Sequence, residues 1–413
     1  MEADGHKNKT LKILCYVHRY GVPARRFIRN GIQDLRREGH EVLVVTDVLV
    51  EPAVVDAAKV IVVPHRAQMP LSLRLRRKWK KYVRGDDHPL DRRIAFNLSL
   101  PLASTRAVFQ AIVRDFQPHV IHVHFGFSLP YVMHLLDNRP PCPVLVTFRG
   151  VDASAFLNGR AYRHALKKAL RHPAVHSSSV ADALRKNLAE HGVDTPRHRL
   201  LYTSIDTELY QRRSPGSPRA VRQFLQISTL EARKGIAITL RAFARWHAKN
   251  PGLNWRLTLA GDGPEETSLR ALARELGLSA HLDWTGRVSV AEGRALLETA
   301  HVFVHHSITP ADGDMEGIPN TVLEAMSMEL PVIVSDHSGL PEALDHGSYG
   351  YLVPEKDIDQ LAEAIERAYR LPYQPAARAR VLRQFSRDKH LIQLLAIYRA
   401  LVETAAKAPA SNN

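Results

Sequence analysis

Two glutamates, Glu316 and Glu324, lie eight positions apart, with Pro319 and Asn320 between them. Proline fits the first turn of a helix and asparagine can cap one, so we expect a helix that begins here. Glu316 then lies in the preceding loop and Glu324 in the early helix. An ionised glutamate accepts hydrogen bonds from two neighbouring hydroxyls, as in a sugar diol, and a helix start suits phosphate. The alternative is a capped core helix with two solvated glutamates.

Short apolar runs alternate with amphipathic stretches along the chain, which predicts parallel sheets covered on both faces. We expect strands at 11–17, 42–45, 60–63, 120–124, 143–147, 222–228, 255–260, 301–305 and 331–335. We expect helices at 27–38, 102–116, 162–170, 236–247, 265–276 and 386–401.

A polar segment at 206–222, which holds Pro215, Gly216 and Pro218, separates two such series. We therefore predict an α/β protein of two doubly wound, Rossmann-like domains, at 1–205 and 206–385, facing across a cleft. Ligands of such sheets bind beyond the carboxyl ends of the strands. We expect the helix at 386–402 to pack back on the first domain, and 403–413 to form a disordered tail.

The bulk composition narrows the class of protein. A chain of 413 residues exceeds one ordinary core, and its two cysteines argue against a disulfide framework. We find neither a signal peptide nor an apolar run long enough to span a bilayer, and we predict a cytoplasmic protein.

The net charge of +15 is concentrated between Arg66 and Arg93, where ten Lys and Arg against three Asp give 10 − 3 = +7. Residues 71–84 read as a basic amphipathic helix suited to an anionic membrane surface, such as the inner face of the cytoplasmic membrane. An ordinary surface helix is the alternative, and nucleic-acid binding is disfavoured because the aromatics are not spaced for stacking. The predicted membrane-binding residues are Arg76, Arg77, Lys78, Trp79, Lys80 and Lys81.

The segment around Glu316 and Glu324 resembles the donor-binding motif of the family-4 retaining glycosyltransferases, which have the two-domain GT-B fold. The resemblance covers nearly the whole chain. The family members that the chain resembles most are exopolysaccharide and lipopolysaccharide enzymes. Further matching segments are 39–42, 124–126, 147–152, 204–206, 233–235, 261–264, 285–288, 331–335, 338–342 and 350–354.

The resemblance implies transfer of a hexosyl unit from a UDP- or GDP-sugar to a glycan or lipid-linked acceptor, with retention of configuration and without a metal. It implies that Glu316 contacts the donor sugar, Glu324 holds the ribose and Lys234 binds the diphosphate. Arg149 and Asp152 would contribute to catalysis from the first domain. The other implied donor-binding residues are Arg233, Gly317, Ile318, Val288, Ser338 and Gly339, and the cleft residues on the acceptor side are His124 and Gly126.

Three positions depart from the family pattern. Ser228 and Thr229 occupy the positions where an arginine usually helps to clamp the diphosphate, so Lys234 must carry more of that task, with Arg233 as its helper or pointing to solvent. Arg149 replaces a common histidine, and it cannot shuttle protons near neutral pH. Ser204 replaces a glycine, which we interpret as structural only.

Two acidic residues, Asp312 and Asp314, imitate the metal-binding DxD motif of another glycosyltransferase fold. We interpret them as part of a solvated loop. Two other functions stay open at this point. A sugar-nucleotide epimerase shares the fold, and a non-catalytic protein could retain a decayed donor site.

Overall fold

The computed structural model describes residues 10–22, 26–51, 59–63, 103–193, 195–213 and 221–407. Its contacts divide the chain into two compact units. Unit 1 comprises Met1–Ser179, Arg185–Leu201 and Leu391–Asn413, and unit 2 comprises Val180–Leu184 and Tyr202–His390. The basic segment 71–84, with all six of its predicted membrane-binding residues, lies outside the described residues.

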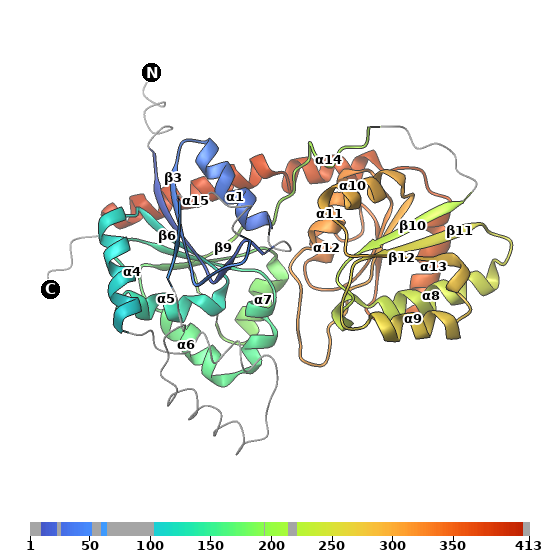
Figure 1. The fold of residues 1–413 in the computed structure, drawn as a ribbon, viewed down its shortest axis with the longest axis horizontal. Helices are drawn as coiled ribbons and strands as arrows, with labels where there is room; N and C mark the ends of the chain where they lie inside the picture. Colours follow the sequence, from blue (N-terminus) through green and yellow to red (C-terminus); the bar gives the residue numbers. More distant parts are fainter. Residues whose placement is uncertain are drawn as a thin grey trace, which may run out of the picture. The chain divides into compact units, whose positions relative to one another are not determined.

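Unit 1 is built on a parallel sheet in the order β5-β3-β1-β6-β7-β8-β9 (Figure 1). Its strands are β1 (Lys12–Val17), β3 (Glu41–Thr46), β5 (Val60–Val62), β6 (Val120–His124), β7 (Val144–Phe148), β8 (Val175–Ser179) and β9 (His198–Leu200). Strands β2 (Arg19–Tyr20) and β4 (Val48–Leu49), which follow β1 and β3 in sequence, form a separate two-stranded parallel sheet. The helices are α1 (Arg26–Arg37), α4 (Ala103–Phe116), α5 (Leu129–Leu135), α6 (Arg160–Leu170), α7 (Asp182–Glu190) and α15 (Arg387–Lys407), of which α7 and α15 have residues in both units.

Unit 2 repeats this plan with the order β12-β11-β10-β13-β14-β15, again all parallel. Its strands are β10 (Arg222–Ile227), β11 (Trp255–Ala260), β12 (Leu282–Gly286), β13 (Val302–His305), β14 (Val332–Ser335) and β15 (Tyr351–Val353). Its helices are α8 (Ile236–Lys249), α9 (Glu266–Glu275), α10 (Val290–Thr299), α11 (Asn320–Ser327), α12 (Leu340–Ala343), α13 (Ile358–Tyr369) and α14 (Pro375–Gln384).

Both orders reverse direction at one point, between β1 and β6 in unit 1 and between β10 and β13 in unit 2. The loops after the two strands that flank such a point diverge, which leaves room for a ligand at the carboxyl edge of the sheet. Central strands such as β6 and β14 are buried throughout because helices cover both faces of each sheet, as α8 and α9 on one face and α10 and α11 on the other do in Figure 1. The predicted doubly wound α/β class is confirmed.

An aromatic cluster fixes the helices of unit 2 to its sheet. The ring of Phe224 on β10 meets Phe243 of α8 edge to face at 4.9 Å, and Phe243 stacks on Trp255 of β11 at 5.1 Å. Trp246 completes the cluster, 5.4 Å from Trp255. Such pairs add specific geometry to the burial of a large apolar area, so the strand that precedes the candidate site is held rigidly.

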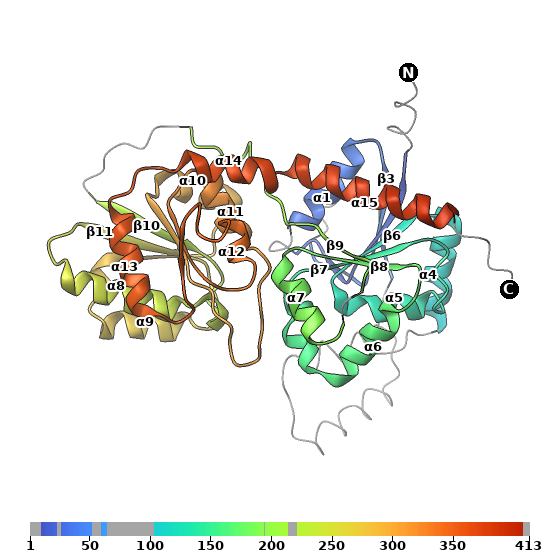
Figure 2. The ribbon, with the colours of Figure 1, turned by 180° about the vertical axis from the view of Figure 1, so that it is seen from behind.

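A buried polar chain connects α15 to the sheet of unit 1, along which the helix runs in Figure 2. The Tyr398 hydroxyl lies 2.6 Å from His122 Nδ1, and His122 Nε2 lies 2.7 Å from the Thr147 hydroxyl. Thr147 is in turn 2.7 Å from the hydroxyl of Ser178. Because all four side chains are buried, each depends on its neighbours for hydrogen bonding.

The predicted disordered tail is wrong for residues 403–407, where α15 continues to Lys407. Glu403, Ala405, Ala406 and Lys407 favour helix, and the helix extends through them at little cost. Within the part of the chain that the structure describes, no helix combines the length and the apolar character needed to cross a membrane.

Replacing Tyr398 by Phe should destabilise unit 1 by about 1–3 kcal/mol, because buried His122 would lose a hydrogen-bond partner. Hydrogen exchange of the β6 amides, measured by mass spectrometry, reports this loss. The matched control is Tyr369→Phe, whose hydroxyl makes only a long, exposed bond of 3.4 Å to Asn254 O. Equal exchange in both variants would contradict the prediction.

Candidate functional site

The candidate site of unit 2 lies at the point where the strand order reverses. Lys234 ends a short 3-10 helix (Ala232–Lys234) that follows β10, and Glu316 lies in the loop that follows β13. Since β10 and β13 are neighbours, both loops start from the same carboxyl edge of the sheet. The sequence placed these two residues in one site, and the structure brings them into direct contact.

Lys234 and Glu316 form a buried ion pair, with Lys234 Nζ 2.6 Å from Glu316 Oε1. Their side chains are only 10% and 6% exposed. Burial lowers the pKa of Lys234, with Glu316 opposing that shift. Burial alone would raise the pKa of Glu316, but Lys234, His305 and Arg233 hold it well below its usual value. Glu316 therefore stays ionised, and it stabilises a buried cation.

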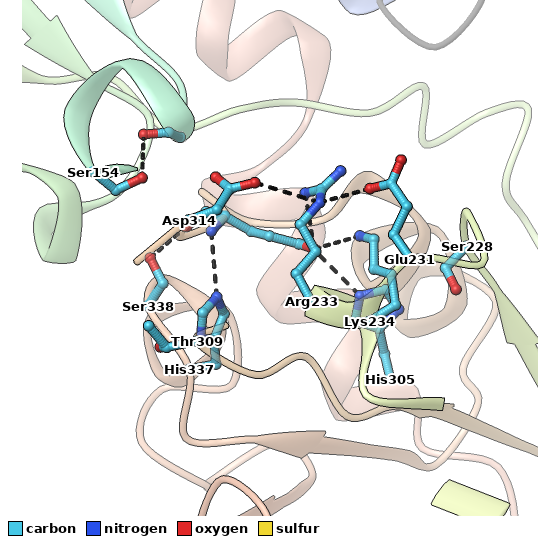
Figure 3. Close-up of polar contacts among 12 residues, drawn as sticks. Ser154, Ser228, Glu231, Arg233, Lys234, His305, Thr309, Asp314, His337 and Ser338 are labelled. Carbon is cyan, nitrogen blue, oxygen red and sulfur yellow. Dashed lines mark hydrogen bonds and ion pairs between the residues drawn. The ribbon is translucent and has the colours of Figure 1, made fainter. Parts of the chain in front are cut away.

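Arg233 is a second cation of this cluster, and the alternative that it points to solvent is wrong. Its guanidinium lies 3.1 Å from Glu316 Oε1, 2.9 Å from Glu231 Oε2 and 3.6 Å from Asp314 Oδ2 (Figure 3). These carboxylates hold the guanidinium over the site instead of letting it extend into water. A positive charge thus occupies the neighbourhood of Lys234, where the usual family arginine is missing.

The sequence context of Asp314 indicated a solvated loop, and for its side chain this prediction is wrong. Its side chain is 20% exposed and faces Arg233. Burial raises its pKa to about 6, with Glu316 and other nearby carboxylates adding to the shift and Arg233 opposing it. A carboxyl group of this kind exchanges a proton near neutral pH.

Gly235 directs the chain from Lys234 into α8. Its φ is +57°, a left-handed conformation that glycine adopts without strain. A Cβ at this position would lie 2.0 Å from the carbonyl oxygen of His306. The close approach joins the Lys234 loop to the loop after β13, and the Ile308 N–H, which donates to Arg233 O at 2.8 Å, reinforces it.

His305 lies beneath the ion pair at the end of β13, with its Nε2 3.8 Å from Glu316 Oε2. Burial, followed by the charge of Lys234, lowers its pKa to about 4. It is therefore neutral near pH 7 and contributes a polar floor to the site, not a charge.

The helix that carries Glu324 is α11, and it begins at Asn320 as expected. The predicted cap by Asn320 is wrong, because Pro319 occupies the N-cap position and no side chain caps the helix. Instead, Asn320 Oδ1 accepts a hydrogen bond from Thr203 Oγ1 at 3.0 Å. Glu324 is buried, which excludes the alternative of two solvated glutamates.

The other residues predicted to bind the sugar donor lie in two places. Gly339 packs so closely on Gly317 and Ile318 that a Cβ would lie 2.8 Å from both, so these residues and Ser338 lie together. Ser338 Oγ donates to the carbonyl of Glu316. Val288 is half-buried in the loop after β12, beside Gly293. Ser228 Oγ accepts from Gln226 Nε2 at 3.4 Å, at the end of β10.

In unit 1, Asp152 is buried and its carboxylate accepts three backbone N–H groups. These come from Gly126 at 2.6 Å and from Arg149 and Gly150 at 3.0 Å each. Burial raises the pKa of Asp152, and these N–H groups oppose the shift. The carboxylate thus ties the turn after β6 to the turn after β7. Its predicted catalytic role stays a prediction, whereas its positioning role is visible.

His124, Gly126 and Arg149 lie together at these two turns. Arg149 Nη2 is 3.4 Å from His124 Nδ1, and its guanidinium lies 4.6 Å from the ring centre of Phe27. His124 stacks on His122 at 4.1 Å. At Gly126 a Cβ would collide with the Phe148 ring at 2.1 Å, so only glycine fits.

Sequence reasoning missed four residues of the site: Glu231 and His305, described above, and His337 and Glu355. His337 Nε2 accepts from the Glu316 N–H at 3.3 Å, and its Nδ1 lies 2.7 Å from Glu355 Oε1. The sequence signals for these last two were their positions, His337 directly before the matching segment 338–342 and Glu355 directly after the matching segment 350–354.

Two family models match the chain, one to each half. The "Glycosyl transferase 4-like domain" matches residues 21–203, and "Glycosyl transferases group 1" matches residues 209–387. The second match contains Lys234, Glu316 and Glu324.

Curated relatives support the same assignment. The chain is 31% identical over 203 residues to the glycosyltransferase WcaL of Salmonella typhimurium, whose name refers to colanic acid biosynthesis; this covers 48% of the chain and 50% of that protein. It is 27% identical over 307 residues to the amylovoran biosynthesis glycosyltransferase AmsK of Erwinia amylovora, covering 71% and 73%. The WcaL match spans about half the length of that relative.

A similar solved structure is Anabaena HepE in complex with UDP-glucose, with a TM-score of 0.66 and 17% identity over 96% of this chain and all of that one. At this identity the likeness shows the fold, which is the GT-B arrangement of two Rossmann-like domains in one chain. The chain therefore carries two glycosyltransferase domains, a glycosyltransferase 4-like domain at 21–203 and a glycosyltransferases group 1 domain at 209–387.

Proposed function

We propose that the protein transfers a hexosyl unit from a UDP- or GDP-sugar to a glycan or lipid-linked acceptor, with retention of configuration, in the synthesis of an exopolysaccharide. The observation that carries this proposal is the Lys234–Glu316 pair at the reversal point of the unit 2 sheet. The names of the colanic acid and amylovoran relatives support the polysaccharide class, and the UDP-glucose complex of a neighbour supports a nucleotide-sugar donor.

The charges of the cluster suit the reaction. Cleaving the bond between the anomeric carbon and the diphosphate oxygen leaves negative charge on the diphosphate and positive charge on the sugar ring. Lys234 and Arg233 would stabilise the leaving diphosphate, helped by N–H groups near Ser338 and Gly339. Without a donor, Glu316 balances both cations, and a bound diphosphate would take over that task. Glu316 would then accept hydrogen bonds from the sugar hydroxyls, while Glu324 holds the ribose.

The first domain would supply the acceptor side. Arg149 and His124 offer hydrogen-bond donors at the carboxyl ends of β7 and β6, and Asp152 keeps their turns in place. From its sequence alone, the basic segment 71–84 is proposed to bind an anionic membrane surface, which would bring a cytoplasmic enzyme to a lipid-linked acceptor.

The assay measures consumption of UDP-glucose and GDP-mannose with and without a membrane extract. Consumption that requires the extract and releases nucleoside diphosphate supports transfer. Conversion of the sugar without any acceptor would identify an epimerase instead, and binding without turnover would identify a non-catalytic protein.

Glu316→Gln and Lys234→Met should each lower kcat by about 100-fold or more, because each removes a charge that the transition state uses. Initial rates of nucleoside diphosphate release test this, with circular dichroism to confirm folding. Glu363→Gln is the control, since Glu363 is 68% exposed on α13. Near-normal rates in both site variants would end the assignment.

Gly235→Ala should abolish donor binding, because the added Cβ must displace the His306 carbonyl and, with it, Lys234. Gly277→Ala separates this clash from the conformational penalty, since Gly277 has a φ of +71° but open space around its Cβ. We expect the control to lose only about 1 kcal/mol of stability and to bind normally in a thermal-shift assay. Equal binding by both variants would contradict the prediction.

Transfer should proceed at an unchanged rate after treatment with EDTA, because Lys234 and Arg233 supply the positive charge that a divalent cation provides in other enzymes. The comparison is the initial rate before treatment and after dialysis with Mg²⁺ or Mn²⁺ restored. A rate that falls with EDTA and returns with either ion would overturn this part of the mechanism.

A further inference from the structure

A second charged pair supports the loop that carries Glu316. His337 follows β14 and is completely buried, and Glu355 follows the neighbouring strand β15 with 23% of its side chain exposed. Their contact, 2.7 Å between His337 Nδ1 and Glu355 Oε1, lies at the same carboxyl edge of the sheet as the Lys234–Glu316 pair.

The surroundings of Glu355 keep it ionised. Oε2 accepts the Thr309 N–H at 2.7 Å, and Oε1 accepts the Thr309 hydroxyl at 2.9 Å. Burial opposes ionisation, but the bonds from His337 and Thr309 lower the pKa of Glu355 to about 2. An ionised carboxylate only accepts hydrogen bonds, so the proton of the short contact resides on His337 Nδ1.

This fixes the other nitrogen of the ring. With a proton on Nδ1, neutral His337 has a free lone pair on Nε2, which accepts the Glu316 N–H at 3.3 Å. The carbonyl of Glu316 accepts a hydrogen bond from the hydroxyl of Ser338, the residue that follows His337 (Figure 3). Ser338 has a φ of +48°, an uncommon conformation for a residue other than glycine. Both backbone polar groups of Glu316 are therefore held by two consecutive side chains.

We propose that His337, oriented by Glu355, is a positioning residue for donor binding: its Nε2 anchors the peptide of Glu316 and thereby holds the Glu316 side chain in the site. This deepens the proposed function, on which its effect on donor affinity rests.

Two segments hold the ring of His337. Glu355 faces it from the end of β15. Thr309 and the peptide of Glu316 face it from the loop after β13. The ring therefore connects the end of β15 to the loop that carries Glu316.

The decisive variants are His337→Ala and His337→Gln. Glutamine can present its oxygen near the position of Nε2, so it keeps an acceptor for the Glu316 N–H. We expect the affinity for UDP-glucose or GDP-mannose to fall about ten-fold in His337→Ala, with a smaller change in kcat. We expect His337→Gln to rescue the affinity to within about three-fold of the wild type.

Two further variants sharpen the test. Glu355→Gln removes the carboxylate that orients the ring, so donor affinity should fall, but by less than in His337→Ala. His346→Ala is the matched control, because His346 is exposed and lies outside the site, and it should behave as the wild type. A purely structural role would lower the melting temperature and kcat together, without a separate loss of affinity that glutamine at position 337 rescues.

Hydrogen exchange of the 306–319 loop in the ligand-free protein separates this inference from the proposed function. We expect exchange about ten-fold faster in His337→Ala than in His346→Ala. Equal exchange, or identical affinity in His337→Ala and the wild type, would overturn the inference. If the wild type binds neither donor, the proposed function fails, and the exchange rates still decide whether His337 anchors the loop.

Discussion

A buried lysine and a buried glutamate impose the main constraint on unit 2. Removing two charges from water is costly, and the cost is offset only when the pair is close and its remaining hydrogen bonds are satisfied. The 2.6 Å contact between Lys234 and Glu316 meets the first condition. Arg233, which donates to Glu316 Oε1 at 3.1 Å, contributes to the second. Removing either residue of the pair leaves the other charge buried without a partner. The pair therefore favours a single arrangement of the surrounding loops.

The parallel sheet makes that arrangement possible. Lys234, Glu316, His337 and Glu355 follow four strands that are adjacent in the order β10-β13-β14-β15. Residues as far apart in sequence as Lys234 and Glu355 thus lie at one edge of the sheet. Unit 1 uses the same geometry, where Asp152 connects the turns that follow β6 and β7. In both units, a carboxylate organises backbone or cations at strand ends.

The sequence predicted the doubly wound class and the central strands well, because runs such as Leu11–Val17 and Val144–Thr147 are short and mostly apolar. It missed β8, whose residues Ser177, Ser178 and Ser179 are polar yet buried; their hydrogen bonds, such as that between the hydroxyls of Ser178 and Thr147, form only in the fold. The pairing of Lys234 with Glu316 was accessible from their motifs. The burial of Asp314 and the contact between His337 and Glu355 depend on neighbouring strands, which no spacing along the chain reveals.

The central claim is that the Lys234–Glu316 pair binds the activated sugar. A crystal structure of the complex with UDP-glucose or GDP-mannose tests it most directly. The account predicts Lys234 Nζ within hydrogen-bond distance of a diphosphate oxygen and Glu316 within the same reach of a sugar hydroxyl. A nucleotide sugar bound elsewhere, with Lys234 and Glu316 still in contact with each other alone, would contradict it.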